Sequence, residues 1–280
     1  MNAPMATPLT DLSRLCVHTI TTKAWSLDEC AKQYSAAGIK GITVWRDTLK
    51  GRDVAASGRL LRDHGLSIVS LCRGGFFTGE TADQRQRAID ENRRCIDEAA
   101  ALGAPAIVLV CGATPGVPLI EARRQITAAL AELLPHAAAA GVSLGIEPLH
   151  PMYAGDRSAI NTIGQARAIC HELQHPRLGI AIDVYHVWWD PDLEKEIAAT
   201  GREGRLLAFH VCDWRVAMTD ILNDRGLMGE GCIPLRQIRT WIEAAGFNGF
   251  NEVEIFSHRH WAADPNQFLA QIKTAYLQFC

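Results

Sequence analysis

The chain has 280 residues, of which 48% are hydrophobic and 21% charged, and its formal net charge is −3. This length allows two small domains, but α/β barrels of similar size fold as one. The nearly balanced charge gives no field that would attract nucleic acid or an anionic membrane, and no apolar run approaches the roughly 20 residues that span a bilayer. The first residues lack the basic and apolar regions of a signal peptide. We therefore expect a cytoplasmic protein that binds neither nucleic acid nor membrane.

Short apolar runs alternate with amphipathic, alanine-rich stretches along the whole chain. Most of the runs are aliphatic or β-branched without strict alternation, which is typical of strands covered on both faces. In chain order the predicted strands are Leu15–Ile20, Gly41–Trp45, Ser67–Cys72, Ala106–Cys111, Ser143–Leu149, Leu178–Val184, Leu206–Cys212 and Asn251–Phe256. Between them, Ala82–Leu102 and Leu119–Ala140 carry apolar stripes of helical period. Gly103 and Gly141 follow these stretches as helix stops.

Eight strand–helix units at about 35 residues each predict an α/β fold, a single (β/α)8 TIM barrel. One domain would span residues 1–280, with residues 1–13 as an irregular N-terminal extension. A doubly wound open sheet would instead show a glycine-rich phosphate loop after the first strand, and the segment VHTITTKAW has none. The nine cysteines are far apart and form no CxxC pair. We expect them to be reduced thiols that fill space in strands.

Acidic and imidazole side chains lie near the ends of the last four predicted strands, where barrel enzymes carry their chemistry. The residues concerned are Glu147, Asp183, His210 and Glu254. Side chains two positions apart on a strand face the same way. If Leu207, Phe209 and Val211 face the helices, His210 faces the barrel axis, and the same reasoning turns the three acidic residues inward.

Each of these residues alone has a simpler explanation, such as a solvated acidic group at a strand end or a core histidine. Three carboxylates buried together, however, would repel one another and lose their hydration. One divalent cation removes both problems. Carboxylate oxygens with one imidazole nitrogen suit Mn²⁺, which we expect, and Mg²⁺, Co²⁺ and Zn²⁺ are alternatives. Glu252 has the same parity as Glu254 but lies deeper, so we assign Glu254 as the ligand.

The segments IEPLH, IDVYH, FHVCDW, GEGCIP and VEIFS together resemble the xylose-isomerase-like TIM-barrel superfamily of sugar isomerases and epimerases, including ketose 3-epimerases. The resemblance covers essentially the whole chain and implies the same four metal ligands. It also implies that His186 and Arg215 contact the substrate. The turn Gly229–Gly231 resembles a family loop to which we assign a structural role.

The resemblance implies a metal-dependent isomerase that transfers a proton next to a carbonyl group through a metal-bound enediolate. Glu147 and Glu254 would be the catalytic acid and base. The substrate would be a small carbohydrate. The residues expected to contact it are His18, Arg73, His186, Trp188 and Arg215. Trp188 belongs to the loop after the sixth strand.

Three alternatives remain. A lyase or dehydratase acting on a keto-sugar or a related hydroxy acid would use the same metal site and the same first proton abstraction. An endonuclease-IV-like DNA-repair enzyme needs further histidines on the third and fourth strands, where this chain reads SLCRGG and VLVCGA. A non-catalytic sugar-binding barrel would have little reason to keep the inward-facing acidic residues. The sequence leaves homo-oligomerisation open.

Overall fold

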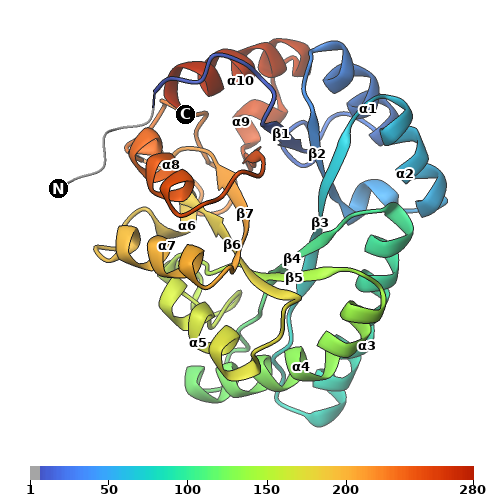
Figure 1. Ribbon diagram of the computed structural model, residues 1–280, viewed down its shortest axis with the longest axis vertical. Coiled ribbons are helices and arrows are strands. Elements are labelled where there is room, and N and C mark those ends of the chain that lie inside the picture. The colour runs from blue at the N-terminus through green and yellow to red at the C-terminus, as the bar shows by residue number, and fades with distance from the viewer. Residues whose placement is uncertain (1–6) are drawn as a thin grey trace.

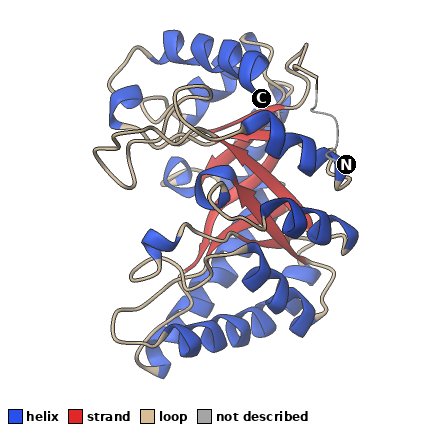
Figure 2. Ribbon diagram, turned by 90° about the vertical axis from the view of Figure 1, so that its left-hand side faces the viewer, coloured by secondary structure: helices blue, strands red, loops and turns tan. Residues whose placement is uncertain are grey.

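Eight parallel strands form a closed barrel at the centre of the protein. The computed structural model describes residues 7–280. Each strand pairs with the next one along the chain, and the last pairs with the first (Figures 1 and 2). The strands are β1 (Leu15–His18), β2 (Gly41–Trp45), β3 (Ser67–Gly75), β4 (Ala106–Val110), β5 (Ser143–Ile146), β6 (Leu178–Asp183), β7 (Leu206–Val211) and β8 (Asn251–Val253). The predicted TIM barrel is confirmed.

Helices surround the barrel and cover the outer face of the sheet (Figure 1). The α-helices are α1 (Leu27–Ala36), α2 (Val54–Asp63), α3 (Ala82–Leu102), α4 (Leu119–Ala139), α5 (Ile163–Leu173), α6 (Val184–Val187), α7 (Leu193–Arg202), α8 (Leu235–Ala244), α9 (His258–Trp261) and α10 (Pro265–Phe279), and the 3₁₀ turns are η1 (Arg46–Leu49) and η2 (Pro151–Tyr153). Helix α3 begins at Thr81, which exchanges hydrogen bonds with Gln84 in a capping box. It ends at Gly103, whose φ of 83° suits glycine.

The main apolar core lies between the sheet and the helices. Ile146, Ile182 and Phe209 belong to it and are at most 1% exposed, as the alternation along their strands predicts. A smaller apolar group lies on the inner side of the barrel. Its members are Cys72, Val108, Ala181 and Ala208.

Leu207 was expected to face the helices, and this expectation was wrong. Strand β7 carries one extra residue opposite the step from Ile180 to Ala181, where the register between β6 and β7 shifts. A methyl group added to Gly145, on the inner face of β5, would lie 2.9 Å from Leu207 Cδ2. Leu207 therefore packs toward the inner face. Because the irregularity inserts one residue, His210 still faces the barrel axis.

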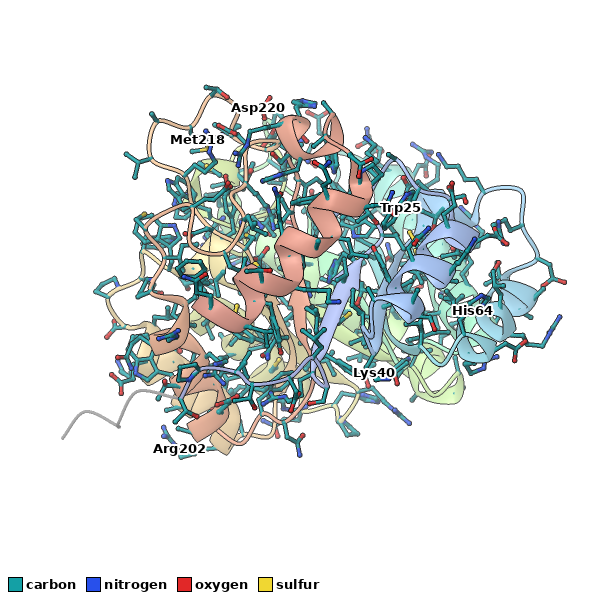
Figure 3. All side chains as sticks on the ribbon, turned by 90° about the horizontal axis from the view of Figure 1, so that it is seen from above. Trp25, Lys40, His64, Arg202, Met218 and Asp220 are labelled. Atoms are coloured by element: carbon teal, nitrogen blue, oxygen red, sulfur yellow. The ribbon has the colours of Figure 1, made fainter. Side chains whose placement is uncertain are left out.

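The two ends of the barrel are distinct in the view from above (Figure 3). Met218 and Asp220, in the loop that follows β7, lie on one side of the molecule. Lys40 and Arg202, which precede β2 and β7, lie on the opposite side. The side chains that follow the strands thus gather at the end marked by Met218 and Asp220, where a TIM barrel carries its site.

The predicted N-terminal extension falls partly outside the described residues, because the description begins at residue 7. Residues 7–13 contain no helix or strand. Among the helices of residues 7–280, none is long and apolar enough to cross a membrane.

Candidate metal centre

Four side chains from consecutive strands converge on one point at the C-terminal end of the barrel. They are Glu147, Asp183, His210 and Glu254, and one ligand atom from each lies within 4.8 Å of the others. All four are buried, with no more than 5% of any of them exposed. These are the residues that the inward parity of the last four strands singled out.

Strand pairing explains the convergence. Asp183, the last residue of β6, pairs with His210 in β7. His210 pairs in turn with Glu252 in β8, so Glu254 stands one step higher on the same face. Glu147 directly follows β5, and its backbone N–H still donates to the carbonyl of Leu109 in β4 at 3.1 Å. The backbone therefore brings all four residues to the same end of the barrel.

The cluster contains buried polar atoms without hydrogen-bond partners, which is the feature expected of a cation site. Glu147 Oε1 and His210 Nδ1 form an ion-pair contact at 3.2 Å, but neither makes a hydrogen bond. Burial raises the pKa of Glu147, and the charges of Glu254 and Asp183 raise it further. A bound divalent cation would satisfy the unpaired atoms and offset this repulsion. The three carboxylates and the imidazole therefore fit such an ion.

Arg225 reaches the cluster from the loop between β7 and α8, and the sequence reasoning missed it. Its side chain is 3% exposed, and Nη1 lies 2.8 Å from Asp183 Oδ2 and 3.0 Å from Glu254 Oε2. Nη2 lies 3.1 Å from Nε2 of His186. One guanidinium compensates one of the three negative charges, and it makes no ion pair with Glu147. Only its position in the segment NDRGLMGEG, shortly before the glycine turn, could have drawn attention to it.

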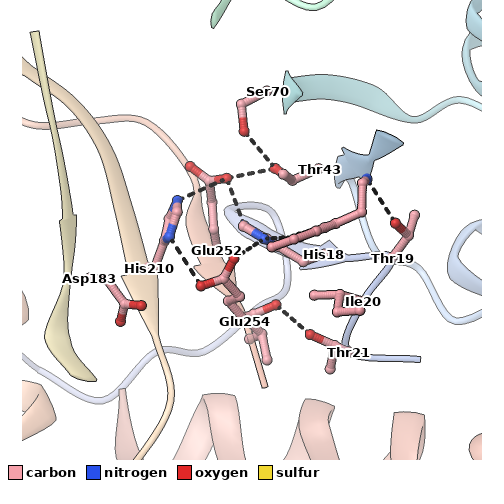
Figure 4. Close-up of polar contacts among 12 residues, drawn as sticks. His18, Thr19, Ile20, Thr21, Thr43, Ser70, Asp183, His210, Glu252 and Glu254 are labelled. Carbon is pink, nitrogen blue, oxygen red and sulfur yellow. Dashed lines mark hydrogen bonds and ion pairs between the residues drawn. The ribbon is translucent and has the colours of Figure 1, made fainter. Parts of the chain in front are cut away.

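A second polar layer lies deeper in the barrel than the four residues, and Figure 4 shows it around Glu252, next to His210 and Glu254. Glu252 Oε2 accepts a hydrogen bond from Thr43 at 2.6 Å and lies 3.2 Å from His18 Nε2. The same oxygen lies 3.8 Å from Nε2 of His210. His18 Nδ1 lies 2.9 Å from Glu254 Oε1. His18 was expected to contact substrate, but its side chain is fully buried in this layer.

The Glu252 carboxylate faces the imidazole nitrogen of His210 that points away from the cluster, at 3.8 Å and without a hydrogen bond. We propose that its charge orients the imidazole ring. Such partners of metal-binding histidines typically contribute about 10–100-fold to metal affinity. We expect Glu252→Gln, which keeps the shape and removes the charge, to weaken Mn²⁺ binding by that factor in a competition titration with a chelating dye. Glu243→Gln, on the outer helix α8, is the matched control and should bind Mn²⁺ normally. Unchanged affinity in Glu252→Gln would contradict this role.

A cavity of about 130 Å³ opens above the cluster. Two of the expected substrate contacts, Arg73 and His186, line it. The remainder of its wall is mixed, with apolar residues, a cysteine and further charged groups: Trp45, Cys72, Val108, Val110, Glu147, Leu149, Tyr153, Arg157, Leu222, Arg225, Glu254 and Phe256. Arg215 and Trp188 are not part of this wall: Arg215 pairs with Asp224, and Trp188 packs against Trp214 at 5.5 Å between ring centroids.

Asp213, which follows β7, organises the loop rather than the cluster. Its carboxylate accepts hydrogen bonds from four backbone N–H groups, including those of Gly229 and Gly231 at 2.9 Å each. Gly229 has a φ of 92°, and a methyl group added to Gly231 would lie 2.0 Å from a backbone carbonyl oxygen. The glycine turn therefore packs against Asp213 in the structural role that we assigned to it.

All nine cysteines are free, and eight of them are buried. Burial raises the pKa of the Cys111 thiol, so it stays protonated in the core. Cys72 is also buried, but it lines the cavity. That it fills space in its strand stays a prediction.

Comparison with known proteins identifies the family. The model of the family described as xylose isomerase-like TIM barrel matches residues 31–276. The chain belongs to this family.

Two relatives are named for different reactions, an isomerisation and a dehydration. The chain is 24% identical over 276 residues to an inosose isomerase of Halalkalibacterium halodurans, covering 94% of this chain and 93% of that protein. It is 26% identical over 253 residues to a 3-dehydroshikimate dehydratase of Pseudomonas putida, covering 86% of this chain but only 38% of that protein.

Solved structures of the family share the fold. Protein SMc04130 from Sinorhizobium meliloti 1021 is 47% identical, with a TM-score of 0.93 over 96% of this chain and 99% of that chain. The IolI protein, whose structure contains a zinc atom, is 20% identical, with a TM-score of 0.82 over 95% and 97% of the two chains. At that identity the likeness to IolI concerns the fold alone.

Proposed function

We propose that this family member is a divalent-metal-dependent isomerase or epimerase that moves a proton at a carbon next to the carbonyl group of a small carbohydrate or cyclitol. The observation that carries the proposal is the convergence of Glu147, Asp183, His210 and Glu254 on one buried point beside a cavity. The inosose isomerase relative, aligned over nearly its whole length, supports the reaction class.

Glu147 and Glu254 are the proposed acid and base. They directly follow β5 and β8, on different sides of the barrel, and both line the cavity. One glutamate removes a proton from the substrate between them, and the other returns one. If the proton returns to the opposite face of the same carbon, the result is epimerisation. If it returns to the adjacent carbon, the result is aldose–ketose isomerisation.

The remaining polar groups would hold the substrate oxygens. A divalent ion held by the four residues would supply positive charge next to the carbonyl oxygen. Arg225 keeps Asp183 and Glu254 in place through its two ion pairs. Its other amino group points toward His186, which lines the cavity. Because a guanidinium only donates, His186 Nε2 accepts from Arg225. The other ring nitrogen, Nδ1, has no hydrogen-bond partner and would carry the proton that His186 can donate to a substrate oxygen as negative charge develops on it.

A dehydratase is the second candidate, favoured by the relative that carries that name. Dehydration begins with the same abstraction of a proton beside a carbonyl. The step that follows is different, because a hydroxyl group leaves from the adjacent carbon as water and no proton returns to carbon. One carboxylate then acts as the base and the other can protonate the leaving hydroxyl.

Proton NMR in D₂O tests the proposal and separates the two candidates. The Mn²⁺-loaded protein should exchange one carbon-bound proton of its substrate for deuterium, and chelation by EDTA should abolish the exchange. We would screen ketoses, inososes and 3-dehydroshikimate. A new stereoisomer or the partner aldose indicates isomerase activity, whereas an unsaturated product indicates a dehydratase. Absence of metal-dependent exchange across the whole panel would contradict the proposed function.

A further inference from the structure

Two arginines in the cavity wall have no acidic partner. Arg73 is the seventh residue of β3, and Arg157 lies in the loop between η2 and α5. The Arg73 guanidinium carbon lies 4.3 Å from the centre of the Phe76 ring, and that of Arg157 lies 5.7 Å from the centre of the Tyr153 ring. Within residues 7–280 neither guanidinium makes an ion pair, although Arg46 and Arg225 each pair with two carboxylates.

The two arginines give the cavity an excess of positive charge. A divalent ion together with Arg225 would balance the three carboxylates of the metal centre. Glu252 lies deeper and faces His18. Arg73 and Arg157 then leave the cavity with two uncompensated positive charges. Arg73 and Arg157 line the same cavity, so their like charges repel each other. Burial lowers the pKa of Arg73 and the charge of Arg157 lowers it further, while Cys72, Glu147 and Glu254 act in the opposite direction. An anion between them would relieve that repulsion.

We propose that Arg73 and Arg157 bind an anionic group of the substrate, a carboxylate or a phosphate ester. The proposal rests on the proposed function and specifies its substrate class as a charged keto compound rather than a neutral sugar. Guanidinium groups bind both anions through paired, charge-assisted hydrogen bonds. Arg73 belongs to β3 and Arg157 follows β5, whereas the metal ligands come from β5 to β8. The anionic group would therefore lie on the β3 side of the cavity, with the carbonyl group toward the metal centre.

Binding measurements with matched charged and neutral compounds test the proposal. The probes are 3-dehydroshikimate against an inosose, and fructose 6-phosphate against fructose, each titrated calorimetrically into Mn²⁺-loaded protein. At least one acidic compound should bind about tenfold or more tightly than its neutral counterpart. Arg73→Met and Arg157→Met should each weaken the binding of that compound by about 10–100-fold, the usual effect of losing a charged hydrogen bond. Arg73→Lys should recover part of the loss.

Arg124→Met is the matched control, because that side chain is 74% exposed on the outer helix α4. Its affinity for the probes should equal that of the wild type, and all variants should keep wild-type Mn²⁺ affinity. The carboxylate and phosphate probes show which anion the site takes. An acid preference that survives in both methionine variants would place the acid on the metal and overturn the proposal. Neutral compounds bound as tightly as their acidic counterparts would also overturn it.

The proposed function is judged separately, by deuterium exchange. Exchange restricted to neutral sugars, with Arg73→Met unaffected, would leave the function intact and refute the anion site. Arginine-dependent binding of an acid without any deuterium exchange would support the anion site and contradict the proposed function.

Discussion

Glu147→Gln and Glu254→Gln should each lose at least about 10²–10⁴-fold in turnover while still binding metal. Glutamine keeps an oxygen that can face the ion but cannot accept or deliver the proton. The two side chains are nearly buried and both line the cavity, so no other carboxylate in its wall could take over their role. The measurement is turnover of the identified substrate by Mn²⁺-loaded variants, with the metal content determined on the same samples.

The same two variants distinguish the candidate reactions. In an epimerase each glutamate serves one face of the substrate carbon, so one variant should still exchange the substrate proton with D₂O without forming product. A dehydratase needs only one base at this carbon, so in that case the variant of the other glutamate should lose much less turnover. Near-normal turnover in both variants, with metal bound, would remove the glutamates from the mechanism and direct attention to His186.

Asp183→Ala and His210→Ala should lose metal and activity together. Each removes one of the four proposed ligands from a fully buried position, where water has little room to replace it. Mass spectrometry of the purified proteins should find about one metal ion per wild-type chain and much less in either variant. The wild-type protein stripped with EDTA should behave like the variants and regain activity when Mn²⁺ is added.

His136→Ala is the control for these two variants. His136 lies on the outer helix α4 and pairs with Asp97 at 2.8 Å, away from the barrel interior. It should keep both metal and activity. Full metal content in Asp183→Ala, or activity in a metal-free variant, would count against the assigned centre.

The barrel and the cluster could be predicted because both depend on local pattern. Apolar runs gave all eight strands, and alternation within the runs gave the inward direction of Asp183 and His210. The ends of the strands were less accurate. The predicted strand Ser143–Leu149 ends at Ile146, because Pro148 has no N–H to donate to a neighbouring strand. Leu149 instead donates to Ile160 in the following loop.

The features that were missed depend on contacts between distant parts of the chain. Arg225 lies 42 residues from Asp183 in sequence and reaches it only because the loop after β7 folds back over the barrel. His18 and Glu252 are 234 residues apart and meet because β1 pairs with β8. The sequence indicated Arg73 and Arg215 as substrate contacts. Arg73 does line the cavity, but from the loop after β7 it is Arg225, and not Arg215, that reaches its wall. No periodicity distinguishes two arginines in one irregular loop.

Anomalous X-ray diffraction from crystals grown with Mn²⁺ would locate the ion directly. We expect one strong anomalous peak among Glu147, Asp183, His210 and Glu254, with ligand atoms about 2.0–2.3 Å from the ion. His18 and Glu252 should lie outside the coordination sphere. Absence of a peak at this point, or an ion bound instead by His18, Cys72 and Glu254, would contradict this expectation.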